Sequence, residues 1–210
     1  MKKTFEKFAL VTLLSVIPLS TASALSISSD PGNPTGYLSG SFVYDFETGL
    51  APASLTGDFQ IRKVSSGNYD GTSAPPFNDN SQYFLTVPNP NRIGSATLTF
   101  NTDQNYLGLY WGSIDTYNTI YFYDGSSLVG TVNGGMLPPA NGAQGNALTN
   151  RYVNITDLTF DKVVFNSNGF AFEIDNIAVA PVPEPTTMLL FGTGLLGLAA
   201  VGRRRTATKA

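Results

Sequence analysis

The chain has 210 residues, of which 42% are hydrophobic and 13% charged, and this length suits one globular domain with additional terminal segments. It contains neither cysteine nor histidine, which excludes disulfide bonds, thiol nucleophiles and imidazole bases or metal ligands. Residues 25–180 hold 5 basic and 13 acidic side chains, a formal charge of −8. Such a surface repels phosphate backbones, so we expect no nucleic-acid partner.

Residues 1–24 have the pattern of a secretory signal peptide. Basic residues precede an apolar run from Phe8 to Leu19, and Ala22-Ser23-Ala24 supplies the small residues that signal peptidase requires. An uncleaved anchor is the alternative, but the run is short for a membrane span and Pro18 interrupts it. We therefore predict a signal helix, export by the secretion machinery and cleavage after Ala24.

The following residues predict a flexible lead-in and then a β domain. Residues 25–36, LSISSDPGNPTG, are rich in turn-forming residues. Residues 37–180 contain short alternating runs between turn signals, without helical periodicity, which predicts an all-β, antiparallel β-sandwich ectodomain of jelly-roll type. The expected strands lie at 41–47, 58–64, 82–87, 95–100, 105–111, 118–124, 151–156, 162–167 and 170–179.

The runs 105–111 and 118–124 predict a hairpin in which Leu109 opposes Ile120 and Leu107 opposes Phe122. Aliphatic side chains bury more readily than tyrosine, so we expect this face in the core. The other face would carry an exposed row of rings suited to stacking on sugars. That row consists of Tyr106, Tyr110, Tyr121 and Tyr123, with Gly108 leaving room for the ring of Tyr121.

The turn DGSS at 124–127 predicts a tight connection into a further strand. Residues 133–149 form a long loop of small residues, which is either a binding loop or a mobile one.

The last expected strand carries two carboxylates and an irregularity. Glu173 and Asp175 share one face, as Asp45 and Glu47 do on the first expected strand. The apolar alternation changes phase after Ile174, which predicts a bulge at Asp175-Asn176. The run FEIDNIAV resembles the closing strand of carbohydrate-binding jelly rolls, and this resemblance implies a structural Ca²⁺ held by Asp45, Glu47 and Asp175. The alternative is that these acids face water.

Enzymatic chemistry has few candidates in this sequence. Ser-His-Asp and Cys-His arrangements are excluded, whereas a glycosidase needs only two carboxylates. No spacing singles out such a pair. Lys63 or Lys162 could form a Ser-Lys dyad, but neither lies in a recognisable motif. We therefore expect no catalytic residue.

The C-terminal segment combines three features in a fixed order. Val182-Pro183-Glu184-Pro185 cannot be helical, residues 186–202 are apolar, and the basic cluster Arg203-Arg204-Arg205 follows. As a helix the apolar stretch would be about 25 Å long, near the lower limit for a bilayer span. The arginines would remain in the cytoplasm and residues 25–185 outside. An ordinary tail anchor with a proline linker is the alternative.

These three features resemble the PEP-CTERM sorting signal of exosortase substrates. The resemblance covers about the last 25 residues and implies that exosortase recognises Pro183-Glu184-Pro185 and processes the tail. It further implies a bacterial protein first tethered to the inner membrane and then moved to the cell surface or extracellular matrix.

The sequence thus predicts four parts: a signal peptide (1–24), a lead-in (25–36), a β-sandwich ectodomain (37–180) and a sorting tail with a transmembrane helix (181–210). We expect a non-catalytic surface protein with exopolysaccharide as a candidate ligand. The alternative is a secreted carbohydrate-active enzyme that uses paired carboxylates.

Overall fold

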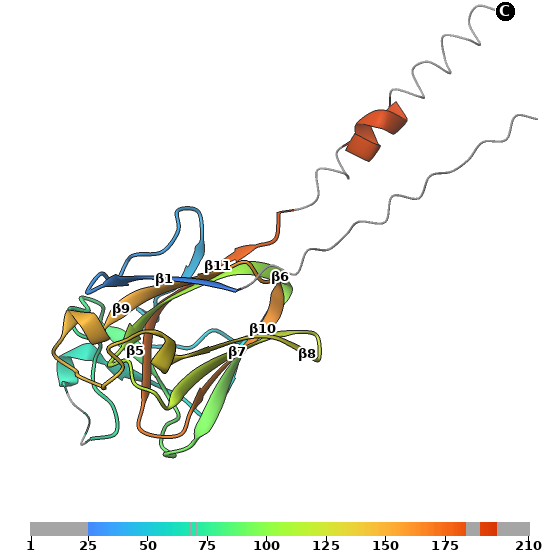
Figure 1. Ribbon diagram of the computed structural model, residues 1–210. Helices are drawn as coiled ribbons and strands as arrows, with labels where there is room; N and C mark the ends of the chain where they lie inside the picture. Colours follow the sequence, from blue (N-terminus) through green and yellow to red (C-terminus); the bar gives the residue numbers. More distant parts are fainter. Residues whose placement is uncertain (1–24, 68, 70, 184–189, 197–210) are drawn as a thin grey trace, which may run out of the picture.

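The computed structural model describes residues 25–67, 69, 71–183 and 190–196 (Figure 1). The expected signal helix and its cleavage residues, Ala22 and Ala24, lie outside the described residues. The same holds for most of the expected transmembrane helix.

The described residues form eleven strands and three short 3-10 helices. The strands are β1 (Ser26–Pro31), β2 (Phe42–Tyr44), β3 (Leu55–Gly57), β4 (Gln60–Lys63), β5 (Tyr83–Val87), β6 (Gly94–Gly112), β7 (Asn118–Asp124), β8 (Ser127–Asn133), β9 (Arg151–Thr156), β10 (Phe160–Ser167) and β11 (Phe172–Pro181). The 3-10 helices are η1 (Val64–Ser66), η2 (Gly134–Met136) and η3 (Ala147–Thr149). All strand pairings are antiparallel.

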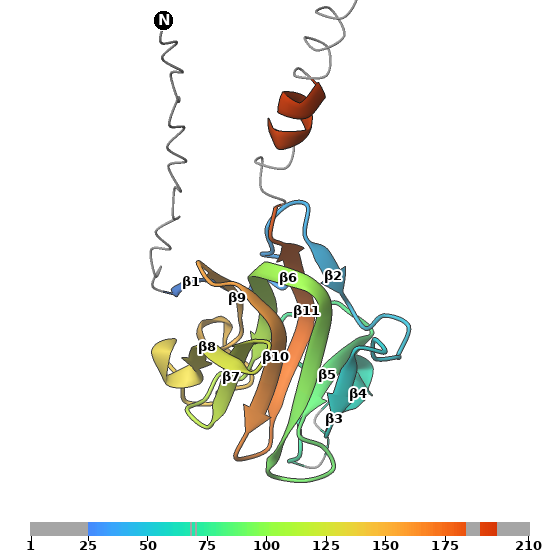
Figure 2. The same ribbon diagram turned by 90° about the vertical axis from the view of Figure 1, so that its right-hand side faces the viewer.

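The strands pack as a two-layered sandwich in which β6 belongs to both layers. The second half of β6 lies between β9 and β11, whereas its first half pairs with β10 and β3. One layer therefore runs β1-β9-β6-β11-β5-β4. The edge of β11 that pairs with β5 through Phe172–Ile174 pairs further along, through Ile177–Val179, with β2. The other runs β3-β6-β10-β7-β8. Figure 2 shows β6 curving between the layers at the end of the molecule where β11 also ends. The all-β antiparallel sandwich predicted from the sequence is confirmed.

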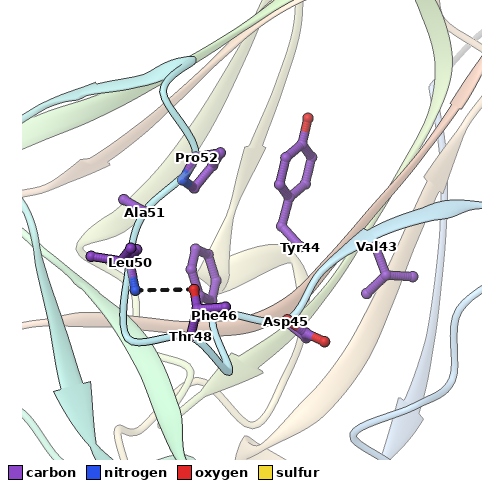
Figure 3. Close-up of a pocket in the computed structure, with 8 residues that line it drawn as sticks. All are labelled: Val43, Tyr44, Asp45, Phe46, Thr48, Leu50, Ala51 and Pro52. Atoms are coloured by element: carbon purple, nitrogen blue, oxygen red, sulfur yellow. Dashed lines mark hydrogen bonds between the residues drawn. The ribbon is translucent and has the colours of Figure 1, made fainter.

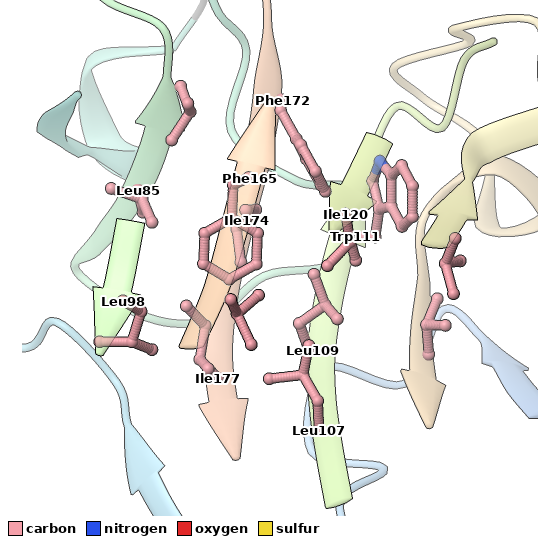
Figure 4. Close-up of a cluster of buried hydrophobic side chains, with 14 of the residues drawn as sticks. Leu85, Leu98, Leu107, Leu109, Trp111, Ile120, Phe165, Phe172, Ile174 and Ile177 are labelled. Carbon is pink, nitrogen blue, oxygen red and sulfur yellow. The ribbon is translucent and has the colours of Figure 1, made fainter. Parts of the chain in front are cut away.

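Alternating side chains of facing strands fill the core (Figure 4). Leu107, Leu109 and Trp111 of β6 point inward from one layer, and Ile120 and Phe122 of β7 point inward from the other. All five are fully buried. Because the chain has no disulfide, this burial and the strand ladders hold the layers together.

The predicted hairpin between β6 and β7 is wrong. Leu109 pairs with Val153 of β9, and Ile120 pairs with Phe165 of β10. Residues 113–117 carry the chain from one layer to the other, so β6 and β7 face each other across the core. Alternation in the sequence determines which side chains point inward, but the same alternation fits both arrangements.

The bulge predicted at Asp175-Asn176 is confirmed. Along the ladder between β11 and β6 the register shifts between Asp175 and Ala178. Asn176 has a φ of 48°, a conformation that asparagine tolerates better than most residues. The shift returns Ile177 and Val179 to the core. The DGSS turn is confirmed as well, because Asp124 pairs with Ser127 between β7 and β8.

The segment predicted as a flexible lead-in contains β1. Ser26–Pro31 pairs with all of β9, and Ile27, opposite Ile155, packs against the core. The alternation Leu25-Ser26-Ile27 carries this strand, but it is too short to stand out beside the following Pro and Gly residues.

In the tail, residues 190–196 are helical and exposed. Among the described residues, no helix combines the length and the apolarity that crossing a membrane requires.

Candidate functional site

Two of the four tyrosines predicted to form an exposed row are buried. Tyr106 is 2% exposed and Tyr110 is fully buried, so the expectation of exposure is wrong for both. They lie on the outer face of the first layer, where they cluster with Tyr152 and Ala178. The segments before β2 and before β5 cover this face. Tyr106 Oη accepts a hydrogen bond from Leu38 N at 3.2 Å, and Tyr110 Oη donates to the carbonyl oxygen of Phe77.

Gly108 provides the space for these rings. A Cβ at this position would lie 2.1 Å from Tyr106 Oη and 2.7 Å from the ring of Tyr152. The ring predicted to lie across Gly108 was that of Tyr121. The side chains that lie there are Tyr106 and Tyr152.

Tyr121 and Tyr123 are half-buried on the outer face of the second layer. Their neighbours on β10 are Val164 and Lys162. The Lys162 ammonium lies 4.7 Å from the centroid of the Tyr123 ring and donates to the carbonyl of Gly125 at 3.0 Å.

The outer face of the first layer also buries a pair of carboxyl groups. One belongs to Asp175 of β11 and the other to Asp79, in the loop that precedes β5. Asp175 is fully buried. Neither carboxyl oxygen of Asp175 accepts a hydrogen bond. Of the two carboxyl oxygens of Asp79, Oδ1 accepts from Ser81 N at 3.0 Å and Oδ2 accepts none. Burial, reinforced by the charge of Asp79, raises the pKa of Asp175 to about 9. Two neighbouring carboxylates cannot both ionise at low cost, so Asp175, the more deeply buried of the two, favours its protonated form at neutral pH.

The predicted calcium ligands do not come together. Asp45 is exposed and its Oδ1 accepts from Glu47 N at 3.2 Å, while Glu47 Oε1 accepts from Gln82 N at 2.8 Å. No group of three or more acidic side chains in the described part of the chain could hold a metal ion. Calcium prefers six to eight oxygen ligands, and the Asp79–Asp175 pair falls well short of that number. The expectation that Asp45, Glu47 and Asp175 converge on one site is therefore wrong for the described chain, and the acid beside Asp175 is Asp79.

A second buried acid lies two residues earlier on β11. Glu173 Oε1 accepts from Ala74 N at 3.0 Å, and its Oε2 has no hydrogen-bond donor. Burial raises the pKa of Glu173 to about 8 and that of Asp115, at the same end of the sandwich, to about 6. The loop that leads into β5 thus covers two carboxyl groups of β11, which keeps both of them protonated near neutral pH.

A polar hollow of about 380 Å³ opens beside Asp79. One wall is the end of β4 with η1, and the other is the start of β5 with the loop before it. Its lining residues are Lys63, Val64, Ser65, Asp79, Asn80, Ser81, Gln82 and Tyr83. The half-buried Tyr83 supplies an aromatic ring, and the Lys63 ammonium lies 5.7 Å from its centroid. We name this hollow the β4–β5 pocket.

The β4–β5 pocket could not be predicted from the sequence, because its polar residues lie in what reads as an ordinary turn. Only the strands that flank it, 58–64 and 82–87, were expected. Asn150, which is fully buried and directly follows the long loop 133–149, ties the end of this loop to other segments. It accepts from Ser113 N and Phe77 N at 2.9 Å each and donates to Asn146 O of the loop at 2.9 Å.

Two of the predicted sorting residues are described. Val182 donates its N–H to the carbonyl of Asp103 at 2.9 Å and is 37% exposed, and Pro183 is exposed. The remaining ones lie outside the described residues: Glu184, Pro185, Arg203, Arg204 and Arg205.

Comparison with known proteins bears on the tail and on the fold. Residues 181–205 match the family described as the PEP-CTERM protein-sorting motif, so the chain carries the sorting motif predicted from its sequence. No curated protein matches the chain.

Three solved structures resemble the sandwich. CpGH89CBM32-6 from Clostridium perfringens is 14% identical, with 62% of this chain and 96% of that chain covered and a TM-score of 0.34. TmCBM61, solved in complex with β-1,4-galactotriose, is 15% identical, covers 66% and 94%, and has a TM-score of 0.35. The K3 adhesin domain of Lys-gingipain from Porphyromonas gingivalis is 15% identical, covers 72% and 98%, and has a TM-score of 0.36. Likenesses at this level identify neither a ligand nor a binding site.

Proposed function

We propose that this chain is an exported bacterial surface protein that exosortase sorts through its C-terminal tail. In this proposal the signal peptide directs secretion, the apolar stretch 186–202 tethers the sandwich to the inner membrane, and exosortase recognises Pro183-Glu184-Pro185 and removes the tail. The protein then reaches the cell surface or the extracellular matrix. The match of residues 181–205 to the sorting motif carries this proposal.

Tail processing in an exosortase-positive host tests it. The Glu184→Ala variant should keep its tail, while the wild type and the neighbouring control Thr187→Ala should lose theirs at equal rates. Immunoblots of a time course, with an epitope placed after Ala210, measure this directly. Equal loss in all three chains would make the motif a mere linker before an ordinary tail anchor.

We further infer that the ectodomain binds glycan without turning it over, as a jelly-roll module in the β4–β5 pocket. The observation that supports this role is the lining of the pocket. It joins an aromatic ring, Tyr83, to the amide groups of Asn80 and Gln82 and to the ammonium of Lys63. Sugars are recognised by a ring that stacks on their apolar face and by polar groups that bond to their hydroxyls. The volume of about 380 Å³ lies within the usual range of small-ligand pockets, ~300 to 1,000 Å³.

The alternative, a carbohydrate-active enzyme, would need two carboxyl groups ~5 to 9.5 Å apart around a scissile bond. Asp79, the acid that lines the pocket, has Asp175 of β11 as a neighbour. Asp175 is also fully buried, so a glycosidic oxygen could not reach it. This arrangement supports a binding role.

Retention on immobilised exopolysaccharide tests the binding role. Tyr83→Ala should weaken retention by about tenfold, the equivalent of ~1.4 kcal/mol of lost stacking. Tyr121→Ala, on the other layer, is the matched control and should bind as the wild type does. The reverse result would place the site on the β7 face, and release of free sugar from the polysaccharide would favour the enzyme.

A further inference from the structure

A groove lined by both apolar and polar side chains lies at the end of the sandwich where the chain leaves β11. Its volume is about 350 Å³, and its apolar lining comes from Phe42, Tyr44, Phe100, Val179 and Pro181. Phe42 is 62% exposed although its ring meets that of Tyr44 edge to face, with centroids 4.9 Å apart. A surface that leaves a phenylalanine so exposed marks a site of interaction when other apolar groups surround it.

Tyr44 also lines a second hollow (Figure 3), so the two hollows adjoin each other at this side chain. The second hollow has a volume of about 240 Å³ and lies between Tyr44 and the loop that carries Leu50 and Pro52. Leu50 is 73% exposed. We call the combined surface, from Leu50 through Tyr44 and Phe42 to Phe100, the tail-end face.

The tail-end face adjoins the exit of the sorting tail. Phe42 pairs with Val179 in the ladder of β2 and β11, and Val182 is fixed by its hydrogen bond to Asp103 O. From Val182 to Thr186, where the apolar stretch begins, the chain can advance at most ~14 Å, because an extended chain spans ~3.3 to 3.6 Å per residue. Wherever the apolar stretch enters a bilayer, this end of the sandwich must lie close to it.

We propose that the tail-end face rests on the lipid headgroup layer while the protein is tethered. This inference rests on the proposed function, because it requires the tail to be inserted in the membrane. Each headgroup layer is ~5 to 8 Å thick, so a linker of at most ~14 Å keeps the rim of the groove within reach of it. Aromatic side chains favour this interface, and Phe42, Tyr44 and Phe100 supply them.

The charges around the face define the type of lipid contact. The residues that line the two hollows include one carboxylate, Asp45, and no basic side chain. Attraction to anionic lipids is therefore absent, and docking depends on apolar contact. Because residues 25–180 carry a formal charge of −8, docking should be no stronger on anionic than on zwitterionic vesicles and should not weaken in high salt.

Single-cysteine labelling of the full chain tests the proposal, because the chain has no cysteine of its own. Phe42→Cys places an environment-sensitive fluorophore on the tail-end face. Leu148→Cys is the matched control: Leu148 is 51% exposed and lies in η3, beside Arg151, at the opposite end of the ladder between β9 and β6. Each labelled chain is reconstituted into phosphatidylcholine vesicles that contain lipid with a headgroup nitroxide.

We expect a several-fold larger loss of fluorescence at position 42 than at position 148, and a blue-shifted emission at position 42 only. Equal quenching in chains that float with the vesicles would overturn the docking and leave the tether intact. Chains that do not float with the vesicles would overturn the tether and the docking together. Quenching at position 42 that disappears at high dilution of protein in the vesicles would show a second copy as the occupant, which also overturns the proposal. If Phe42→Cys loses the native fluorescence of the buried Trp111, Leu50→Cys probes the same face.

Discussion

The buried acid Asp175 should make the sandwich less stable as the pH rises. Its pKa is raised by burial to about 9, whereas it is 3.8 in the unfolded chain. Between these values the folded protein holds a proton that the unfolded chain has released, so the free energy of unfolding falls with increasing pH. The slope for one proton is ~1.4 kcal/mol per pH unit, which gives about 4 kcal/mol between pH 5 and pH 8 as an upper value. Glu173, whose pKa is about 8, adds a slope of the same sign.

Asp175→Asn removes this contribution without changing the shape of the side chain. Its amide can also donate a hydrogen bond to the unpartnered Asp79 Oδ2. Compared with the wild type, the variant should gain stability as the pH rises, by up to about 4 kcal/mol between pH 5 and pH 8. The two chains should be nearly equal only below the unfolded pKa of 3.8, because neutral Asp and Asn present similar groups.

Urea unfolding of a chain that ends at Pro183 measures the effect at pH 5, 6.5 and 8. The single tryptophan, Trp111, is fully buried and reports unfolding through its fluorescence. Asp124→Asn, at an exposed turn position, is the control and should follow the wild-type curve. A wild-type stability that is constant or rises from pH 5 to pH 8 would refute the raised pKa of Asp175, as would an Asp175→Asn variant that is less stable than the wild type at pH 8.

Three further predictions concern the same layer. Gly108→Ala should destabilise the fold by about 1 to 3 kcal/mol, since its Cβ would overlap Tyr106 and Tyr152, and thermal melting checks this. Asn150→Ala should cost about 3 kcal/mol or more, because it leaves two backbone N–H groups without their acceptor, and a midpoint of urea unfolding within error of the wild type would contradict it. The melting temperature should be the same in millimolar Ca²⁺ as in EDTA, because no three acidic side chains in the described part of the chain lie close enough to bind a metal ion together. Stabilisation by Ca²⁺ would contradict this and would make the Asp79–Asp175 pair the first candidate for a cation site.

The sequence predicted the strands of this protein better than their partners. Alternation identified the inward side chains of β6, β7 and β11, including the bulge at Asp175-Asn176, because burial of every second residue is a local property. It could not determine that β6 passes from one layer to the other, since strand pairing depends on contacts between segments distant in sequence. For the same reason the hairpin of β6 with β7 was predicted wrongly.

Burial on the outer face was equally hidden from the sequence. Tyr106 and Tyr110 were expected in water because tyrosine is amphipathic, and nothing in the residues before β2 or β5 indicated that these segments would cover them. Asp79 was not singled out at all, because an acid in a turn is ordinary and its partner lies 96 positions later in the chain. The sorting motif, by contrast, is a linear signal, and the sequence was sufficient to identify it.

The position of β11 has a mechanical consequence for a protein held by its C-terminus. β11 is bonded along one side to β6 and along the other to β5 and β2, and the tail continues directly from its end. A force applied through the tail therefore acts along the axis of an interior strand. It must shear the hydrogen bonds on both sides of that strand at once, whereas a pull across an edge strand would open them one after another. Load from the anchor thus falls on the part of the sandwich that resists it most strongly.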